Sequence, residues 1–265
     1  MRLKSLALWV LLAWLLVASI GAVFDFKPNE IHLDLILSSP SFKHILGFDD
    51  LGRDILPRLL AGAQVSLLVV LLVTVITSVI GITLGLVSGY YGGWVDRVLM
   101  QITDVFLAFP GILLAIAFAA VLGAGLNNLI LALCLTSWVG YARLTRAQAL
   151  SLRQRQHVVA AESLGASVPR LMFKHMLPLL AAPLLVEATY SMAGLVIAEA
   201  SLSFLGLGIQ APNASWGAML RDGVRYMLVA PHYVLAVGLS LMSLVLAVNV
   251  LGDQLRDQLE VRGKK

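Results

Sequence analysis

Three carboxylates stand in or beside long apolar runs of this sequence, where an unpaired charge is costly and marks either function or close helix contact. Glu187 and Glu199 belong to one run, and Asp104 lies at the edge of another. At about 100° per helical residue, the two glutamates are about 120° apart and face different directions. Each carboxylate is a candidate for the wall of a path through a membrane or for a hydrogen-bonded helix contact. The contact is the preferred interpretation of all three, and for Glu199 the neighbouring Ser201 and Ser203 favour it.

Other reactive groups are too scattered to predict a catalytic centre. None of the five histidines is three or four residues from another, so no metal site is predicted. The sequence contains no Gly-x-x-x-x-Gly-Lys-[Ser/Thr] motif, and we therefore expect no ATP hydrolysis and no bound cofactor on this chain. A single cysteine, Cys134, excludes an internal disulfide. The chain is predicted not to be an enzyme.

The elements that carry these residues are predicted to be membrane helices. The 265 residues are 59% hydrophobic and 13% charged, with a mean hydropathy of +0.90, unlike an average soluble domain. At about 20 apolar residues per crossing, six spans are expected. Four lie near residues 6–23, 63–87, 179–205 and 230–251, and two more lie between Asp104 and Arg143, divided at residues 123–128. The predicted fold class is an all-α polytopic membrane protein. A cleaved signal with a small-residue site at 18–22 is the alternative for the first span.

Two features of the spans predict their shape. Gly81, Gly85 and Gly89 recur every four residues and so share one helix face, which favours helix packing over a substrate role. Pro110 frees a backbone carbonyl and is expected to kink the third span.

Residues 143–178 form the one long polar interval, with a single acid, Glu162. The interval holds six basic residues: Arg143, Arg146, Arg153, Arg155, Arg170 and Lys174. With a cytoplasmic N-terminus, thirteen Lys and Arg fall inside and six outside (Lys27, Lys43, Arg53, Arg58, Arg221 and Arg225), as the positive-inside rule requires. Both termini and this interval are therefore predicted to be cytoplasmic, with residues 26–58 and 206–226 outside. The net charge of +4 gathers in these inside segments, so no nucleic-acid surface is expected.

The interval also predicts two short helices joined by a turn. Residues 158–164 favour a helix, and Gly165 can end it at positive φ. Ser167 can cap the next helix, Pro169 suits its first turn, and Pro178 is expected to stop or kink it.

This interval resembles the "EAA" loop of bacterial ABC-importer permeases, which is Glu-Ala-Ala, three residues, Gly, nine residues, and then a hydrophobic position and Leu-Pro. The frame falls here on Val159, Ala160, Ala161, Gly165, Leu177 and Pro178. Val159 stands where the family usually has Glu, and His175 where it often has Ile. Glu162 is out of frame and is not given the role of the missing acid. The bland alternative is an amphipathic loop on the membrane surface.

Two further segments resemble the peptide and nickel permeases of the same family. Residues 46–67 are similar to the entrance to their second span, and residues 199–208, followed by Ser215-Trp-Gly217, are similar to their late signature. Together the three segments cover residues 46–253 in the family's order. The chain is identified as a "C"-type permease subunit of the dipeptide/oligopeptide/nickel family.

The resemblance implies a type I permease bundle in the bacterial inner membrane. Its partners would be a second homologous permease, two cytoplasmic ATPases that bind ATP and Mg²⁺, a periplasmic binding protein and lipid. The EAA loop would be the coupling helix that meets the ATPase. The implied domains are residues 1–62, with the first span and an outer segment, a permease core at 63–253 containing the coupling loop at 143–178, and a cytoplasmic tail at 254–265.

The cargo is left open between peptides and nickel or a nickel chelate. Peptides are favoured because no histidine lies in the middle of a span to meet a metal. A secondary transporter driven by an ion gradient is the more distant alternative, but no internal repeat supports it. An intramembrane enzyme or a scaffold is a third, for which the spans hold no constellation of reactive groups.

Overall fold

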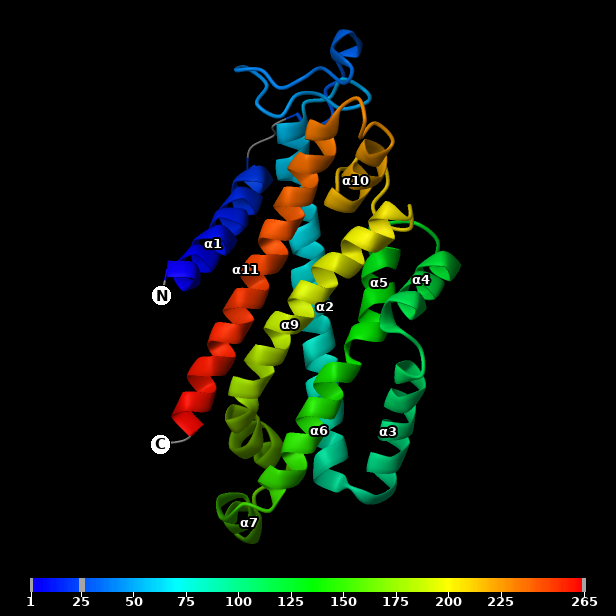
Figure 1. Ribbon diagram of the computed structural model, residues 1–265. Helices are drawn as coiled ribbons and strands as arrows, with labels where there is room; N and C mark the ends of the chain where they lie inside the picture. Colours follow the sequence, from blue (N-terminus) through cyan, green and yellow to red (C-terminus); the bar gives the residue numbers. More distant parts are fainter. Residues whose placement is uncertain (1, 24–26, 264–265) are drawn as a thin grey trace.

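The computed structural model describes residues 2–23 and 27–263 (Figure 1). Within these residues all regular elements are helices, apart from an isolated bridge between Phe48 and Asp54. Residues 1, 24–26 and 264–265 lie outside the described part, and with them two of the predicted cytoplasmic charges, Lys264 and Lys265.

Four long helices form most of the bundle: α1 (Arg2–Val23), α2 (Ile55–Tyr91), α9 (Leu177–Phe204) and α11 (Pro231–Gly263). Helix α2 begins well before the predicted start near residue 63, because Asp54 caps it. The Asp54 side chain accepts a hydrogen bond from the backbone N–H of Leu56 at 3.0 Å.

The predicted third span is broken, not merely kinked. Helix α3 (Gly93–Leu107) and helix α4 (Gly111–Leu122) meet at an angle of 86°. Pro110, which can donate no backbone hydrogen bond, occupies the N-cap position of α4. The predicted bend at Pro110 is therefore confirmed, but it separates two helices instead of kinking one.

The predicted fourth span consists of α5 (Leu126–Ser137) and α6 (Val139–Arg153). Helix α6 continues through the first part of the polar interval 143–178, so this interval begins as helix and not as loop. Gly81, Gly85 and Gly89 of α2 lie against α6, where an added methyl group would come within 2.5–2.6 Å of an α6 atom. The glycines thus let the two backbones approach closely.

The rest of the polar interval contains α7 (Gln156–Ser163), α8 (Val168–Arg170) and the π-helical turn η2 (Leu171–Met176). Ser167 occupies the N-cap position of α8, but its side chain makes no capping hydrogen bond, and Pro169 lies in the first turn. The prediction that Pro178 stops or kinks the helix is wrong. The helix is continuous through residues 168–204, and Pro178 lies in the first turn of α9, directly after the wider π turn, where its missing N–H is tolerated.

Three segments are long and apolar enough to cross a membrane: Ile55–Tyr91, Val168–Phe204 and Pro231–Leu259. The bent pair α3–α4 makes a fourth if it is one span, and α1 holds a shorter apolar stretch, Leu6–Ile20. These candidates come from the described residues alone, and six crossings remain a prediction.

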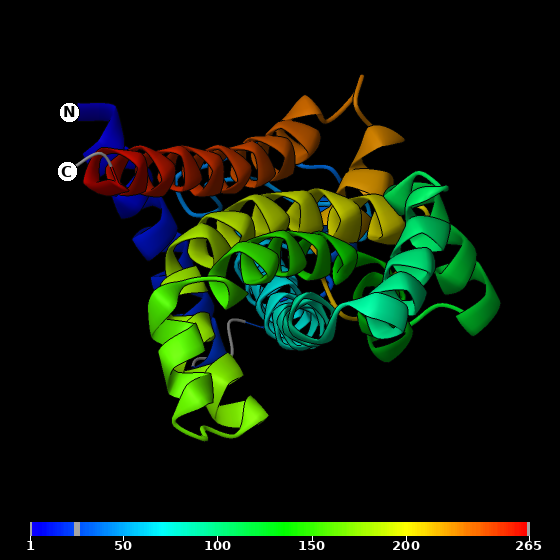
Figure 2. The same ribbon diagram turned by 90° about the horizontal axis from the view of Figure 1, so that it is seen from below.

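The bundle has two distinct ends (Figure 1). Residues 27–54, with the short helix η1 (Leu33–Leu35), lie beside α10 (Trp216–Val224) at one end, which we call the α10 end. Helix α7 and the end of α11 lie at the opposite end, the α7 end. A view along the bundle shows α2 nearly end-on, with α6 and α9 beside it (Figure 2). Both helices contact α2, which is therefore the central element.

Candidate functional site

The turn after α7 has the two hydrogen bonds of a Schellman motif. The N–H of Gly165 donates to the carbonyl of Glu162 at 2.9 Å, and that of Ala166 to the carbonyl of Ala161 at 3.0 Å. Gly165 has a φ of +82°, the positive value predicted from the sequence. Because a side chain is strained at such a φ, glycine allows α7 to end sharply and the chain to turn back into α8.

Two contacts hold α7 against the bundle, and a third, from α6, lies beside the tyrosine that makes one of them. Val158 is fully buried in the hydrophobic cluster of the α7 end. The Tyr90 hydroxyl at the end of α2 donates to Glu162 Oε1 at 3.1 Å, and the Arg153 guanidinium lies 5.4 Å from the centre of the Tyr90 ring. Sequence reasoning gave neither Glu162 nor Tyr90 a role, because their contact joins residues that are far apart in the chain. Glu162 thus anchors the loop.

The residues in the EAA frame divide into an exposed and an inward-facing group. Val159 is 46% exposed, and Ala160, Gly165 and Pro178 are also exposed. Ala161 and Leu177 are half-buried and pack against the cluster at the α7 end. The adjacent Leu164 is 88% exposed. Helix α7 and its C-cap residue Leu164 therefore form an exposed apolar surface with Val159 and Ala160, whereas Ala161 packs towards the bundle.

A second polar contact near this end joins three helices. Arg146 of α6 forms an ion pair with Asp96 at the start of α3, with Nη2 donating to Oδ2 at 2.6 Å and Nε to Oδ1. The Ser88 hydroxyl of α2 donates to the same carboxylate at 2.5 Å. The helix that leads into α7 is thereby tied to the broken span, which the sequence did not reveal.

Glu199 is a contact between helices within this chain. Its carboxylate is fully buried and accepts hydrogen bonds from Ser66 of α2 and from Ser203 of α9, both at 2.9 Å. Two hydroxyl donors satisfy a carboxylate that would be costly to bury alone. This geometry agrees with the packing interpretation of Glu199, and the fully buried side chain is not in contact with an open path.

Glu187 occupies a different environment. It is half-buried and lines a cavity of about 480 Å³ between α3–α4, α5–α6 and α9. Together with Tyr190 it also lines a second cavity, of about 700 Å³, whose other walls come from α6 and the end of α11. Asp104, the third predicted carboxylate, is exposed on α3 and lines neither of these two cavities. Of the three, Glu187 is thus the one that faces open space inside the fold.

The histidines remain dispersed in the structure. His44 Nδ1 lies 2.7 Å from Asp54 Oδ2, and His32 Nε2 lies 3.9 Å from Glu30. Among the residues that the structure describes, no group of three or more His, Cys, Asp or Glu could hold a metal ion.

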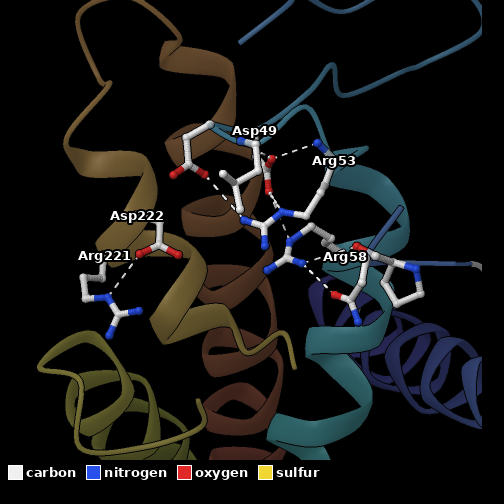
Figure 3. Close-up of polar contacts among 9 residues, drawn as sticks. Asp49, Arg53, Arg58, Arg221 and Asp222 are labelled. Carbon is white, nitrogen blue, oxygen red and sulfur yellow. Dashed lines mark hydrogen bonds and ion pairs between the residues drawn. The ribbon is translucent and has the colours of Figure 1, made fainter. Parts of the chain in front are cut away.

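A buried ionic cluster closes the α10 end (Figure 3). Asp49 is fully buried, and its Oδ2 lies 2.7 Å from Arg53 Nε and 3.3 Å from Arg58 Nε, while its Oδ1 accepts from the backbone N–H of Leu51 and of Arg53. Arg58 also donates to the side chain of Asn29 at 2.9 Å. Residues 27–54 are therefore fixed to the start of α2.

The two segments that resembled peptide permeases outside the EAA loop meet at this same end. The Trp216 indole N–H donates to the carbonyl of Leu59 at 3.0 Å, and Gly62 lies beside the Trp216 ring. A methyl group added at Gly217 would lie 2.2 Å from the carbonyl of Ala200. These segments therefore build the packed contact between α2, α9 and α10.

Comparison with known proteins identifies the family of this chain. Residues 81–262 match the family described as binding-protein-dependent transport system inner membrane component. The chain is 45% identical over 236 residues to the glutathione transport system permease protein GsiD of Escherichia coli O6:K15:H31 and of Shigella boydii serotype 4. The match covers 89% of this chain and 78% of each relative.

Solved structures show the same fold. A chain of the MetNI methionine ABC transporter, in an inward-facing conformation, superposes with a TM-score of 0.63 at 20% identity, covering 77% of this chain and 97% of that one. A second crystal form gives a TM-score of 0.60 at 22% identity, over 76% and 95% of the two chains. The fold is thus the type I ABC permease bundle. This chain belongs to the binding-protein-dependent transport system inner membrane components, the membrane-embedded permease subunits of ABC importers, which work with an ATPase and a binding protein.

Proposed function

We propose that this permease carries di- or oligopeptides and that α7 is its contact with the ATPase. The observation that carries the coupling role is the exposed apolar surface of Val159, Ala160 and Leu164 on a helix anchored from behind by Val158 and Glu162. Because these contacts fix α7 to the bundle, a displacement of α7 by the ATPase would also displace the helices that α7 packs against. A surface loop without such contacts would move without displacing these helices.

The anchors also suggest where such a displacement would travel. From α7 the chain leads back into α6, which contacts α2 closely through the glycine face and α3 through the Asp96–Arg146 ion pair. It leads forward through the continuous helix 168–204 to the cavity beside Glu187. Movement of α7 would therefore reach both walls of that cavity.

The expected assembly follows from the proposed contact between α7 and the ATPase. Two ATPase subunits bind ATP and Mg²⁺ and engage α7 and its counterpart on a second, homologous permease chain. The α7 end and both termini face the cytoplasm, and the α10 end receives the peptide from the binding protein. The charge distribution supports this orientation, because thirteen basic residues of the sequence then lie inside and six outside.

Peptides are proposed as cargo because the 45% identical relatives are named for glutathione, which is a tripeptide. Nickel is the other cargo considered for this family. The described residues hold no group of His, Cys, Asp or Glu that could bind a metal, and neither cavity is lined by a histidine. No observation therefore favours nickel over peptides.

The test uses the complete complex reconstituted in proteoliposomes, with uptake of a labelled dipeptide, of glutathione and of nickel measured in parallel. Ala160→Arg places bulk and charge on the exposed face of α7, and Ser151→Arg adds the same side chain at an exposed position on α6. Ala160→Arg is expected to abolish peptide uptake and stimulated ATPase activity while the permease is still inserted.

Ser151→Arg is expected to retain both activities. Equal activity of the two variants would contradict the coupling role of α7. Uptake of nickel but of neither peptide would contradict the proposed cargo.

A further inference from the structure

The position of Glu187 relates the two cavities to each other. It lies midway along the 37-residue helical segment Val168–Phe204 and lines both cavities. The first cavity follows α9 from Glu187 towards the α10 end as far as Ala198, and the second follows it towards the α7 end as far as Leu179. A solute that moved along α9 between the two cavities would pass this carboxylate.

The Glu187 carboxylate also lacks the partners that satisfy Glu199. Among residues 6–20 and 27–259, whose side chains the structure describes, no hydrogen bond or ion pair to Glu187 is observed, whereas Glu199 accepts from two serines. A half-buried carboxylate without a partner is unfavourable in an apolar setting. A cation that enters the cavity would relieve this cost, and the contact would be a charge-assisted hydrogen bond.

The fold makes room for the carboxylate in this orientation. A methyl group added at Gly140 of α6 would lie 2.7 Å from Glu187 Oε1, so any larger residue there would displace the acid. Gly194, which lines the same cavity, has open space around it. A methyl group at Gly140 would thus meet Glu187, whereas one at Gly194 would not. Alanine substitutions at these two glycines therefore form a matched pair.

The remaining walls suit a small amphipathic solute. Most of the lining is apolar, and the hydroxyl-bearing residues Thr136, Ser137 and Ser191 also line the cavity, whereas the Tyr190 hydroxyl donates to Asp253. The volume of about 480 Å³ lies within the roughly 300–1,000 Å³ typical of small-molecule sites. The Glu187 carboxylate matches the ammonium group of a short peptide, the hydroxyls match its amides and its terminal carboxylate, and the apolar walls match its side chains.

We propose that Glu187 binds the ammonium group of the peptide as it passes through the permease. The proposal rests on the proposed function, because it names the group of the cargo that this residue recognises. The interaction is expected to be weak and rapidly reversible, because a single charge-assisted contact in an open cavity contributes little binding free energy. The partner permease could instead supply a cation to this carboxylate, and the experiment separates the two cases.

The experiment measures protection of a cysteine beside Glu187 in the purified complex. Ser191→Cys, in a Cys134→Ser background, is labelled with a thiol reagent in the presence of dialanine or of N-acetyl-dialanine, without the binding protein. Dialanine is expected to slow the labelling, and the acetylated peptide, which lacks the ammonium group, is expected to be about tenfold less effective. Adding Glu187→Gln should remove this difference, whereas Glu199→Gln should preserve it.

The glycine pair provides a second reading. Gly140→Ala should weaken protection by dialanine, while Gly194→Ala should leave it unchanged. Equal protection by both peptides, or the same difference after Glu187→Gln, would overturn the proposal. So would a Ser191→Cys that stays unlabelled in the complex together with loss of assembly on Glu187→Gln, since the partner permease would then fill the cavity.

Transport separates failure of this inference from failure of the proposed function. If the wild-type complex takes up no dipeptide, the proposed cargo is wrong. If uptake is normal in wild type and unchanged by Glu187→Gln, only the role of Glu187 is wrong.

Discussion

Different kinds of contact stabilise the two ends of this permease. At the α10 end, the fully buried Asp49 contacts two arginines and two backbone amides and so fixes residues 27–54 to the bundle. At the α7 end, one buried valine and one tyrosine–glutamate hydrogen bond hold a helix whose other face is exposed. The α10 end is thus held by buried ionic contacts, whereas the α7 end combines a few anchoring contacts with an exposed apolar surface.

The carboxylates of α9 repeat this contrast inside the bundle. Glu199 lies towards the α10 end, where two serines satisfy it, and Glu187 lies nearer the α7 end and faces open space. Both acids stand in the same apolar run, so their chemistry differs only through what surrounds them. A buried acid with hydrogen-bond donors indicates a structural contact between helices. An acid that faces a cavity without such donors indicates a binding site for a ligand.

The largest effect is expected from breaking the cluster at the α10 end. Asp49→Ala leaves the buried guanidinium of Arg58 without its carboxylate, which costs about 3–5 kcal/mol in comparable buried ion pairs. We expect a marked fall in the thermal unfolding midpoint of the purified complex and poor assembly. Asp34→Ala, at an exposed position within the same residues 27–54, is the control and should match wild type. A normal midpoint for Asp49→Ala would show that the α10 end does not depend on this cluster.

A smaller and more selective effect is expected at the α7 end. Tyr90→Phe removes only the hydrogen bond to Glu162, worth about 0.5–1.5 kcal/mol, so the unfolding midpoint should hardly change. Coupling should suffer more than stability, because α7 loses one of its few anchors, and we expect a partial loss of stimulated ATPase activity. Tyr91→Phe, on the exposed neighbour, should have no effect. If the midpoint fell while coupling stayed normal, Tyr90 would be a structural residue only.

Local chemistry explains which features could be predicted from the sequence. Apolar runs gave the approximate positions of the long helices, and Gly165 indicated its own positive φ, because both depend on neighbouring residues. Pro110 indicated the break between α3 and α4 but not its 86° angle, which packing against other helices determines. Pro178 was misjudged, because the π turn before it is a property of the folded helix and not of a proline motif.

The side-chain pairs that define the sites were beyond sequence reasoning for a different reason. Tyr90 meets Glu162, and Asp96 meets Arg146, across separations of 72 and 50 residues. The residues around each member of these pairs contain no sequence pattern that predicts its partner. The distinction between Glu187 and Glu199 likewise required the cavities and the serine donors to be placed. Sequence periodicity showed only that the two acids face different directions.

Cross-linking from α7 to the ATPase tests the central claim most directly. Single cysteines at Ala160 and at Ser41, both exposed, are introduced in a Cys134→Ser background and treated with a short photoactivatable thiol cross-linker in the assembled complex. The account predicts that Ala160→Cys becomes linked to the ATPase subunit and that Ser41→Cys, at the α10 end, does not. A complex that is active in peptide uptake but shows no ATPase adduct from Ala160→Cys would contradict it.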